Sequence, residues 1–168
     1  MASAHGGSIS RLPQAFKDEW GKFTEFSAAC DDACVTLLNS LSADFMEYHR
    51  VKQPSDTGLK LVSHPALAKL SDVGENLHTD GGTLTLLFYK DWSVHAFFPD
   101  AGMWAFIPPP MEGCVLMNVA NCLQSMSGGK FRSPEHRVTQ PFNGANDRYY
   151  LSYYLRPEAA VVERWNKK

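Results

Sequence analysis

The sequence predicts a mostly β domain preceded by a long helix, and two features of its hydrophobic pattern indicate this. Over residues 16–48, apolar side chains recur every three or four residues, which is the period of an amphipathic helix. After residue 57, short apolar or alternating runs follow one another, with Gly, Pro, Asn and Asp between them. That rhythm is typical of an antiparallel β sandwich or barrel.

The helical part is expected to support the β domain. Pro13 suits the first turn of a helix, and the apolar stripe after it predicts one long helix or two consecutive ones. A short helix is expected at residues 121–126, because Gly128 and Gly129 would end it. The predicted organisation is a flexible lead at 1–15, a helical support at 16–50, the β domain at 57–157 and a C-terminal tail at 158–168.

The β domain is expected to contain seven strands. Each corresponds to a short apolar or alternating run bounded by turn-forming residues. A chain of 168 residues, 44% of them hydrophobic, is long enough to bury the core of one such domain. The runs are 59–62, 84–89, 94–98, 104–107, 114–119, 137–139 and 149–155.

Charge and composition argue against several classes of protein. The formal net charge is −2 and the 16 basic residues are scattered, so neither nucleic acid nor membrane is an expected partner. No apolar run approaches the length of a membrane span, and residues 1–10 lack the apolar stretch of a signal peptide. The 4 cysteines form no CxxC pair, and we interpret them as buried thiols of a cytoplasmic protein.

The motif that points to chemistry is His78-Thr79-Asp80, which precedes an alternating run. In an extended chain, residues i and i+2 point to the same side, so the imidazole and the carboxylate converge. A second histidine on another strand could complete a triangle of ligands. Two imidazoles and one carboxylate leave three octahedral positions open, which is the arrangement that iron(II) oxygenases need.

Four segments of the chain, taken together and in order, are more specific than this motif. They are LHTDGGTLTLL at 77–87, MNVANCLQSMSGGKF at 117–131, SPEHRV at 133–138 and DRYYLSYYLRP at 147–157. These segments resemble the isopenicillin N synthase-like family of non-haem iron(II) and 2-oxoglutarate-dependent oxygenases. The resemblance covers roughly residues 57–157. The separation from Asp80 to His136, 136 − 80 = 56 residues, is of the size usual in that family.

The resemblance implies a double-stranded β-helix, or jelly roll, and the long N-terminal helix expected from the apolar periodicity would pack on it. It implies that His78, Asp80 and His136 bind iron(II). It also implies that Arg148 holds a carboxylate of the co-substrate 2-oxoglutarate, since a guanidinium fork matches a carboxylate bidentately. The activity it implies is oxidation of a C–H bond of a small organic substrate with molecular oxygen.

Two positions depart from the family pattern at the co-substrate site. The family places a serine two residues after the arginine, and here that position is Tyr150. The family also has a Tyr-Pro pair before the metal-binding motif, and here His64 precedes Pro65. Two of three expected carboxylate contacts are therefore altered, which leaves the use of 2-oxoglutarate open. The Tyr150 hydroxyl could bind the co-substrate instead, or its ring could fill the pocket.

Three functions are compatible with this pattern. The first is an iron(II)- and 2-oxoglutarate-dependent oxygenase of small-molecule metabolism. The second is an iron(II) oxidase or cyclase that needs no 2-oxoglutarate, because a carboxylate of its own substrate occupies the Arg148 site. The third is a degenerate, non-catalytic jelly roll that keeps the ligands but acts as a binding module, which the short N-terminal part would favour.

The substrate and the oligomeric state are less well defined by the sequence. Phe88, Trp104 and Phe142 are aromatic candidates for the lining of a substrate pocket. The short N-terminal part would leave an edge of the sheet exposed, and a homodimer through that edge is one way to cover it. The pattern does not distinguish hydroxylation from desaturation or cyclisation.

Overall fold

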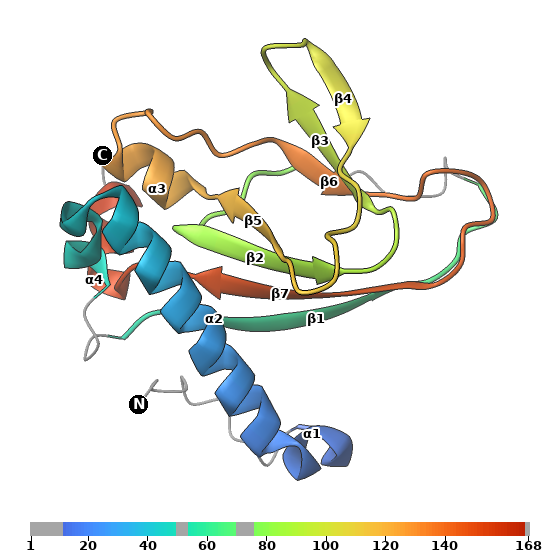
Figure 1. Cartoon of the computed structure of the whole chain (residues 1–168), viewed down its shortest axis with the longest axis horizontal. Coiled ribbons are helices and arrows are strands. Elements are labelled where there is room, and N and C mark those ends of the chain that lie inside the picture. The colour runs from blue at the N-terminus through green and yellow to red at the C-terminus, as the bar shows by residue number, and fades with distance from the viewer. Residues whose placement is uncertain (1–11, 50–53, 70–75, 167–168) are drawn as a thin grey trace. The chain divides into compact units, whose positions relative to one another are not determined.

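The computed structural model describes residues 12–49, 54–69 and 76–166 (Figure 1). The chain divides into two compact units. The first unit combines the described parts of Met1–Gly58 and Leu155–Lys168, and the second is Leu59–Tyr154. The helices lie mainly in the first unit, and the sheets that carry the site lie in the second.

The second unit is mainly β, and its strands form two sheets (Figure 1). One sheet has four strands in the order β1-β7-β2-β5, and the other has three in the order β4-β3-β6. The pairs β2–β5, β3–β4 and β3–β6 are antiparallel. The strands are β1 (Gly58–His64), β2 (Leu84–Tyr89), β3 (Val94–Phe98), β4 (Met103–Phe106), β5 (Leu116–Val119), β6 (His136–Val138) and β7 (Arg148–Leu155).

The three-stranded sheet has one buried face and one partly exposed face. Val94 and Ala96 of β3 are buried, and they pair with Val138 and His136 of β6, which are buried as well. Paired residues of neighbouring strands project to the same face. The register therefore places the side chain of His136 on the buried face, whereas its neighbour Arg137 projects to the opposite one.

The seven expected strands are all present, and β2 and β3 have the expected bounds. The strand expected from residue 114 begins later, at Leu116, because a turn precedes it. In that turn Cys114 N–H donates to the Met111 carbonyl at 2.9 Å, and Gly113 takes a φ of 77°, which favours glycine. Cys114 is consequently exposed, so the expectation of four buried thiols is wrong at this position.

The expected N-terminal helix is interrupted at both ends. Helix α2 (Trp20–Leu41) buries Cys30, Cys34 and Leu38, which are spaced four residues apart along one stripe. It ends at Leu41 because Ser42 is extended (φ −171°, ψ 134°) and its side chain accepts a hydrogen bond from Asp44 N–H at 3.3 Å. The other helices are α1 (Gln14–Asp18), the 3₁₀ helix η2 (Ala43–Tyr48), α3 (Asn121–Met126) and α4 (Ala159–Asn166).

The N-terminal and C-terminal parts of the first unit are joined by hydrogen bonds. The Thr57 hydroxyl binds both the N–H and the carbonyl of Arg156, at 2.9 and 3.1 Å. Glu158 N–H donates to the Tyr48 carbonyl at 3.1 Å. Within the described residues, no helix is both long and apolar enough to cross a membrane. The flexible lead expected at 1–15 lies mostly outside these residues.

Candidate metal centre and carboxylate site

The structure brings together His78, Asp80 and His136. Each offers one metal-binding atom, and these three atoms lie within 4.8 Å of one another. The Nε2 atoms of both histidines lie 3.8 Å from Oδ1 of Asp80, and the two imidazole centroids are 4.4 Å apart. The sequence motif and the distant histidine thus converge on one point in the fold.

Backbone pairing explains why two residues so far apart in sequence meet. His78 and His136 form an antiparallel β bridge. His78 N–H donates to the His136 carbonyl at 3.0 Å, and His136 N–H donates to the His78 carbonyl at 2.9 Å. Side chains of directly opposed residues lie on the same face of a sheet. Asp80, two residues after His78, reaches the same point.

Hydrogen bonds to the backbone fix the orientation of both imidazoles. His78 Nδ1 lies 2.6 Å from the Asn76 carbonyl, and His136 Nδ1 lies 3.0 Å from the Pro134 carbonyl. A carbonyl oxygen only accepts, so each Nδ1 carries the proton. In the neutral rings, each Nε2 therefore keeps a lone pair, and both lone pairs face Asp80.

The donor set fits a cation. With both rings neutral, two imidazole lone pairs and one carboxylate converge, and none of these groups supplies a proton to the others. Asp80 is 5% exposed, and its Oδ2 is buried without a hydrogen-bond partner among the described residues. Burial of an unpaired carboxylate is costly, and a metal ion would satisfy all three groups at once. His78 is the most accessible of them, with a side chain 47% exposed.

Helix α3 holds the loop that carries Asp80. Asn121 N–H donates to the Asp80 carbonyl at 2.8 Å, and the Asn121 side-chain amide donates to the Thr79 hydroxyl at 3.0 Å. Cys122 N–H donates to the Gly82 carbonyl at 2.9 Å. The N–H groups at the start of a helix have no partner within the helix, and here they bind the motif loop. The sequence pattern gave Asn121 no role in holding this loop.

Arg148, the first residue of β7, is a buried cation. It is 4% exposed, and its Nη1 donates to the Thr139 carbonyl at 2.7 Å, whereas its Nε has no hydrogen-bond partner within the described ranges. Burial lowers the pKa of Arg148, and the nearby charges of Asp91 and Asp147 oppose that shift. No carboxylate of the described residues lies within ion-pair distance of it. The guanidinium can therefore donate hydrogen bonds to a carboxylate of a bound ligand.

The two residues that depart from the family pattern contact each other. The rings of His64 and Tyr150 are stacked with centroids 5.6 Å apart, and the Tyr150 hydroxyl lies 3.5 Å from His64 Nε2. Burial first, then Tyr154 and Asp80, raise the pKa of Tyr150 to about 12. Burial first, then the positive charge of Arg148, lowers the pKa of His64. The pair is therefore electrostatically coupled to both the arginine and the metal-binding aspartate.

The three aromatic candidates for the substrate pocket are not brought together. Phe88 lines a cavity of about 710 Å³ with Tyr149 and Met111. Trp104 projects from β4 to the partly exposed face of its sheet, where the Arg137 guanidinium lies 5.0 Å from its ring. Phe142 is 62% exposed. Alternation along β4 explains the outward direction of Trp104, and a short strand of apolar residues does not show which face is buried.

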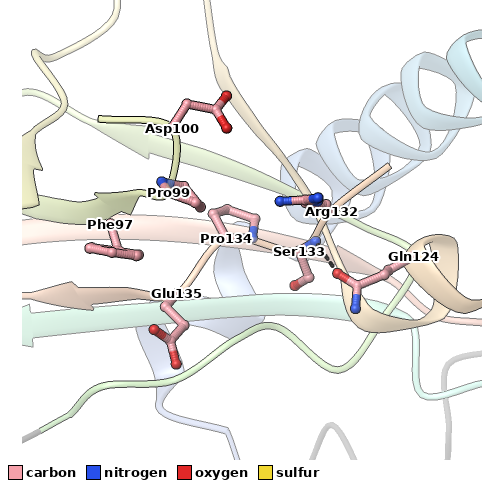
Figure 2. A pocket seen from close by; sticks show the side chains of 8 residues that line it. All are labelled: Phe97, Pro99, Asp100, Gln124, Arg132, Ser133, Pro134 and Glu135. Atoms are coloured by element: carbon pink, nitrogen blue, oxygen red, sulfur yellow. Dashed lines mark hydrogen bonds between the residues drawn. The ribbon is translucent and has the colours of Figure 1, made fainter. Parts of the chain in front are cut away.

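Another cavity, of about 530 Å³, lies beside the loop that precedes β6 (Figure 2). Phe97, Arg132 and Glu135 are among its lining residues, and Ser133 N–H donates to the Gln124 side chain at 2.7 Å. The metal-binding side chains line neither this cavity nor the larger one. The candidate site is therefore identified by its donor atoms and not by an enclosed volume.

The fold and the candidate site together define a class of protein. Its members have antiparallel sheets and a mononuclear metal site of two histidines and one carboxylate, with a His-x-Asp motif opposite a distant histidine. Within that class, the chain belongs to the 2OG-Fe(II) oxygenase superfamily, whose family model matches residues 48–157. This match confirms the resemblance to iron(II)- and 2-oxoglutarate-dependent oxygenases. The sequence motifs and the family model thus identify the same part of the chain.

Two fungal relatives agree with this assignment. The 2-oxoglutarate-dependent dioxygenase FG08081 of Gibberella zeae is 35% identical over 86% of this chain and 46% of its own length. The 2-oxoglutarate-dependent dioxygenase iboH of Amanita muscaria is 32% identical over 89% of this chain and 78% of its own length. The chain spans about half the length of most curated relatives that it matches.

A solved structure supports the fold. The dioxygenase for auxin oxidation in rice superposes with a TM-score of 0.67, and the match covers 89% of this chain and 50% of that protein. The two sequences are 20% identical, so the likeness concerns the fold alone. It agrees with the mainly β unit and its antiparallel sheets.

Proposed function

We propose that this chain is an iron(II)- and 2-oxoglutarate-dependent oxygenase that uses molecular oxygen to oxidise a C–H bond of a small organic substrate. The observation that carries the proposal is the convergence of three acceptor atoms, from His78, Asp80 and His136, within 4.8 Å. The family assignment and the names of the relatives agree with it. A role in small-molecule metabolism is part of the same proposal, and the fungal dioxygenases among the relatives are compatible with it.

The side chains of the proposed centre have separate roles. His78, Asp80 and His136 would hold the iron and leave part of its surroundings open, because they supply only three ligand atoms. When bound, iron(II) would activate molecular oxygen for attack on an unactivated C–H bond, and the electrons that reduce the oxygen would come from 2-oxoglutarate and from the organic substrate. Asp80 and His136 are buried, whereas His78 is half exposed, so the organic substrate would approach from the His78 side.

Arg148 would hold the far carboxylate of 2-oxoglutarate. Its guanidinium is buried, retains an unpartnered Nε, and forms no ion pair with a carboxylate of the described residues, although the charges of Asp91 and Asp147 are near enough to act on it. A bound carboxylate would give this cation the partner that a buried charge requires. The Tyr150 hydroxyl, two residues along the same strand face, would donate to the carboxylate in the place where the family has serine.

A second function is favoured by the contact between Tyr150 and His64. Their stacked rings add volume beside Arg148, where the family pattern has a serine and a tyrosine. If this pair excludes 2-oxoglutarate, the chain is an iron(II) oxidase or cyclase whose own substrate supplies the carboxylate. Tyr150 separates the two functions, because only its ring would block the far carboxylate.

The finer architecture belongs to the same proposal. The two sheets would form a jelly roll over residues 57–157, with residues 16–50 as a helical support and 158–168 as a tail. An edge strand of one sheet would form the interface of a homodimer, and a cytoplasmic location stays a prediction.

Oxygen consumption with iron(II), measured with and without 2-oxoglutarate, tests these functions. Consumption that requires 2-oxoglutarate supports the first function. Consumption that requires only iron(II) and an organic substrate supports the second. An absence of both, in a chain that binds metal, would leave the non-catalytic binding module as the better description.

A further inference from the structure

We infer that Asn76 is a positioning residue of the metal centre. Its side chain forms the hydrogen bonds to Val138 that its backbone would otherwise form, and its backbone carbonyl is then free to fix the imidazole of His78. This inference rests on the proposed metal centre. It concerns a residue outside the ligand set, two positions before the His-x-Asp motif, for which the sequence analysis gave no role.

The bridge between His78 and His136 sets the expected hydrogen bonds of their neighbours. In a regular antiparallel ladder, the next hydrogen-bonded pair lies two residues away on each chain, which here is Asn76 opposite Val138. Their backbones would exchange two hydrogen bonds, as those of the two histidines do. Arg137, between them, points its backbone groups to β3, where it pairs with His95.

Asn76 instead uses its side chain for this pair. Its Nδ2 donates to the Val138 carbonyl at 2.7 Å, and its Oδ1 accepts from Val138 N–H at 2.9 Å. The orientation of the amide is fixed, because an N–H only donates and a carbonyl only accepts. Both backbone groups of Val138, a residue 9% exposed, are therefore satisfied without the backbone of Asn76.

The exchange leaves the backbone carbonyl of Asn76 available for the histidine. That carbonyl accepts a hydrogen bond from His78 Nδ1 at 2.6 Å, so it holds the ring with Nε2 facing Asp80. His78 is the ligand that most needs such support, since its side chain is 47% exposed, against 6% for His136. Asparagine suits the position because its amide offers both an N–H donor and a carbonyl acceptor, as a peptide group does.

The consequence is a specific expectation for Asn76→Ala. Without the amide, the backbone at position 76 can rejoin the ladder opposite Val138, so the sheet is preserved. Its carbonyl then turns away from His78, and the imidazole becomes free to rotate. Loss of an outer hydrogen-bond partner typically weakens metal binding by about 10- to 100-fold, and we expect a change in that range for cobalt(II).

The experiment compares cobalt(II) binding to the full chain, to Asn76→Ala and to Ser127→Ala, below the melting temperature of each. Ser127 is the matched control, because its hydroxyl also makes two hydrogen bonds to backbone groups, with the Gln124 carbonyl at 3.0 Å and Phe131 N–H at 3.1 Å. Both variants should melt earlier. Only Asn76→Ala should lose cobalt(II) affinity, and its cobalt absorption bands should shift.

If Asn76→Ala does not fold, the hydrogen bond from His78 Nδ1 can still be tested in the metal-free, unsubstituted chain. Nitrogen-15 spectra of its imidazoles should show a protected Nδ1–H on His78 and on His136. In Asn76→Ala the His78 signal should be lost, while the His136 signal, held by the Pro134 carbonyl, remains as the internal control.

The outcomes separate this inference from the proposed function. Equal cobalt(II) affinity of Asn76→Ala and the unsubstituted chain overturns the inference and leaves the metal centre intact. An unprotected Nδ1–H on His78 in the unsubstituted chain also overturns it. Failure of the unsubstituted chain to bind cobalt(II) overturns the metal centre itself, and the role of Asn76 with it.

Discussion

The substitution Asp80→Asn should stabilise the metal-free chain while it removes metal binding. Asp80 is 5% exposed, its Oδ2 has no hydrogen-bond partner among the described residues, and its Oδ1 lies 3.8 Å from two histidine nitrogens. When the imidazoles are neutral, those nitrogens carry lone pairs, because each Nδ1 holds the proton. The native carboxylate then faces acceptors and receives no proton from them.

Asparagine has nearly the same shape but removes the charge and adds a donor. With its Nδ2 in the place of Oδ1, it can donate to one Nε2 lone pair, and its oxygen no longer carries a buried charge. A buried polar group without a partner costs about 1–3 kcal/mol, which sets the expected gain in the free energy of unfolding without metal. The carboxylate would then be a group kept for binding at the expense of stability.

Urea denaturation in the presence of a chelator measures the gain, and repeated titration with cobalt(II) measures the loss. A ligand at 100 times its dissociation constant stabilises a folded protein by about 2.7 kcal/mol. The unsubstituted chain should show this increase and Asp80→Asn should not. Asp100→Asn is the matched control, because Asp100 is exposed in the same unit, and neither quantity should change.

Two results would refute this reasoning. Destabilisation of metal-free Asp80→Asn would mean that the carboxylate already has a favourable partner, such as a protonated histidine. Retention of cobalt(II) binding by Asp80→Asn would mean that the three side chains do not form the metal centre.

Three further predictions concern the carboxylate site and the first unit. Arg148→Lys should weaken 2-oxoglutarate binding by about 10- to 150-fold, since one charge-assisted hydrogen bond of about 1.5–3 kcal/mol is lost, whereas Arg132→Lys should not. Tyr150→Ser should retain or improve 2-oxoglutarate turnover if the native chain already has it, and turnover only in the variant would identify the native chain as an oxidase or cyclase. Burial lowers the pKa of His49 to about 4, against the opposing charges of Asp31 and Glu158. The first unit should therefore become less stable as the pH falls from 6.5 towards 4, because only the unfolded chain takes up the proton. Urea titrations should show a loss of roughly 1–2 kcal/mol between pH 7 and pH 5, and this loss should disappear in His49→Gln.

Local pattern was enough to predict the secondary structure of the second unit. The strands at Leu84–Tyr89 and Val94–Phe98 and the helix at Asn121–Met126 appear with the expected bounds. These segments have strong apolar runs and glycine or proline boundaries, so the local signal and the tertiary environment agree. Where a turn overrides the apolar run, as at Cys114, the sequence interpretation was wrong.

The sequence also determined the chemistry of the candidate site. His78 and Asp80 are close in the chain, so extended geometry alone brings them to one side. Arg148 and His136 were found by resemblance, because their positions depend on strands that no local pattern connects. The structure brings His136 to His78 through a two-residue backbone bridge.

Tertiary structure alone decided the contacts around these residues. The pairing of Asn76 with Val138, of Asn121 with the motif loop and of His64 with Tyr150 joins residues 62, 41 and 86 positions apart. Such contacts depend on strand register and on which sheet face is buried, and alternation in a short apolar strand specifies neither. The sequence therefore determined which side chains are candidates for binding a metal and a carboxylate, and the fold determined which backbone groups hold them in place.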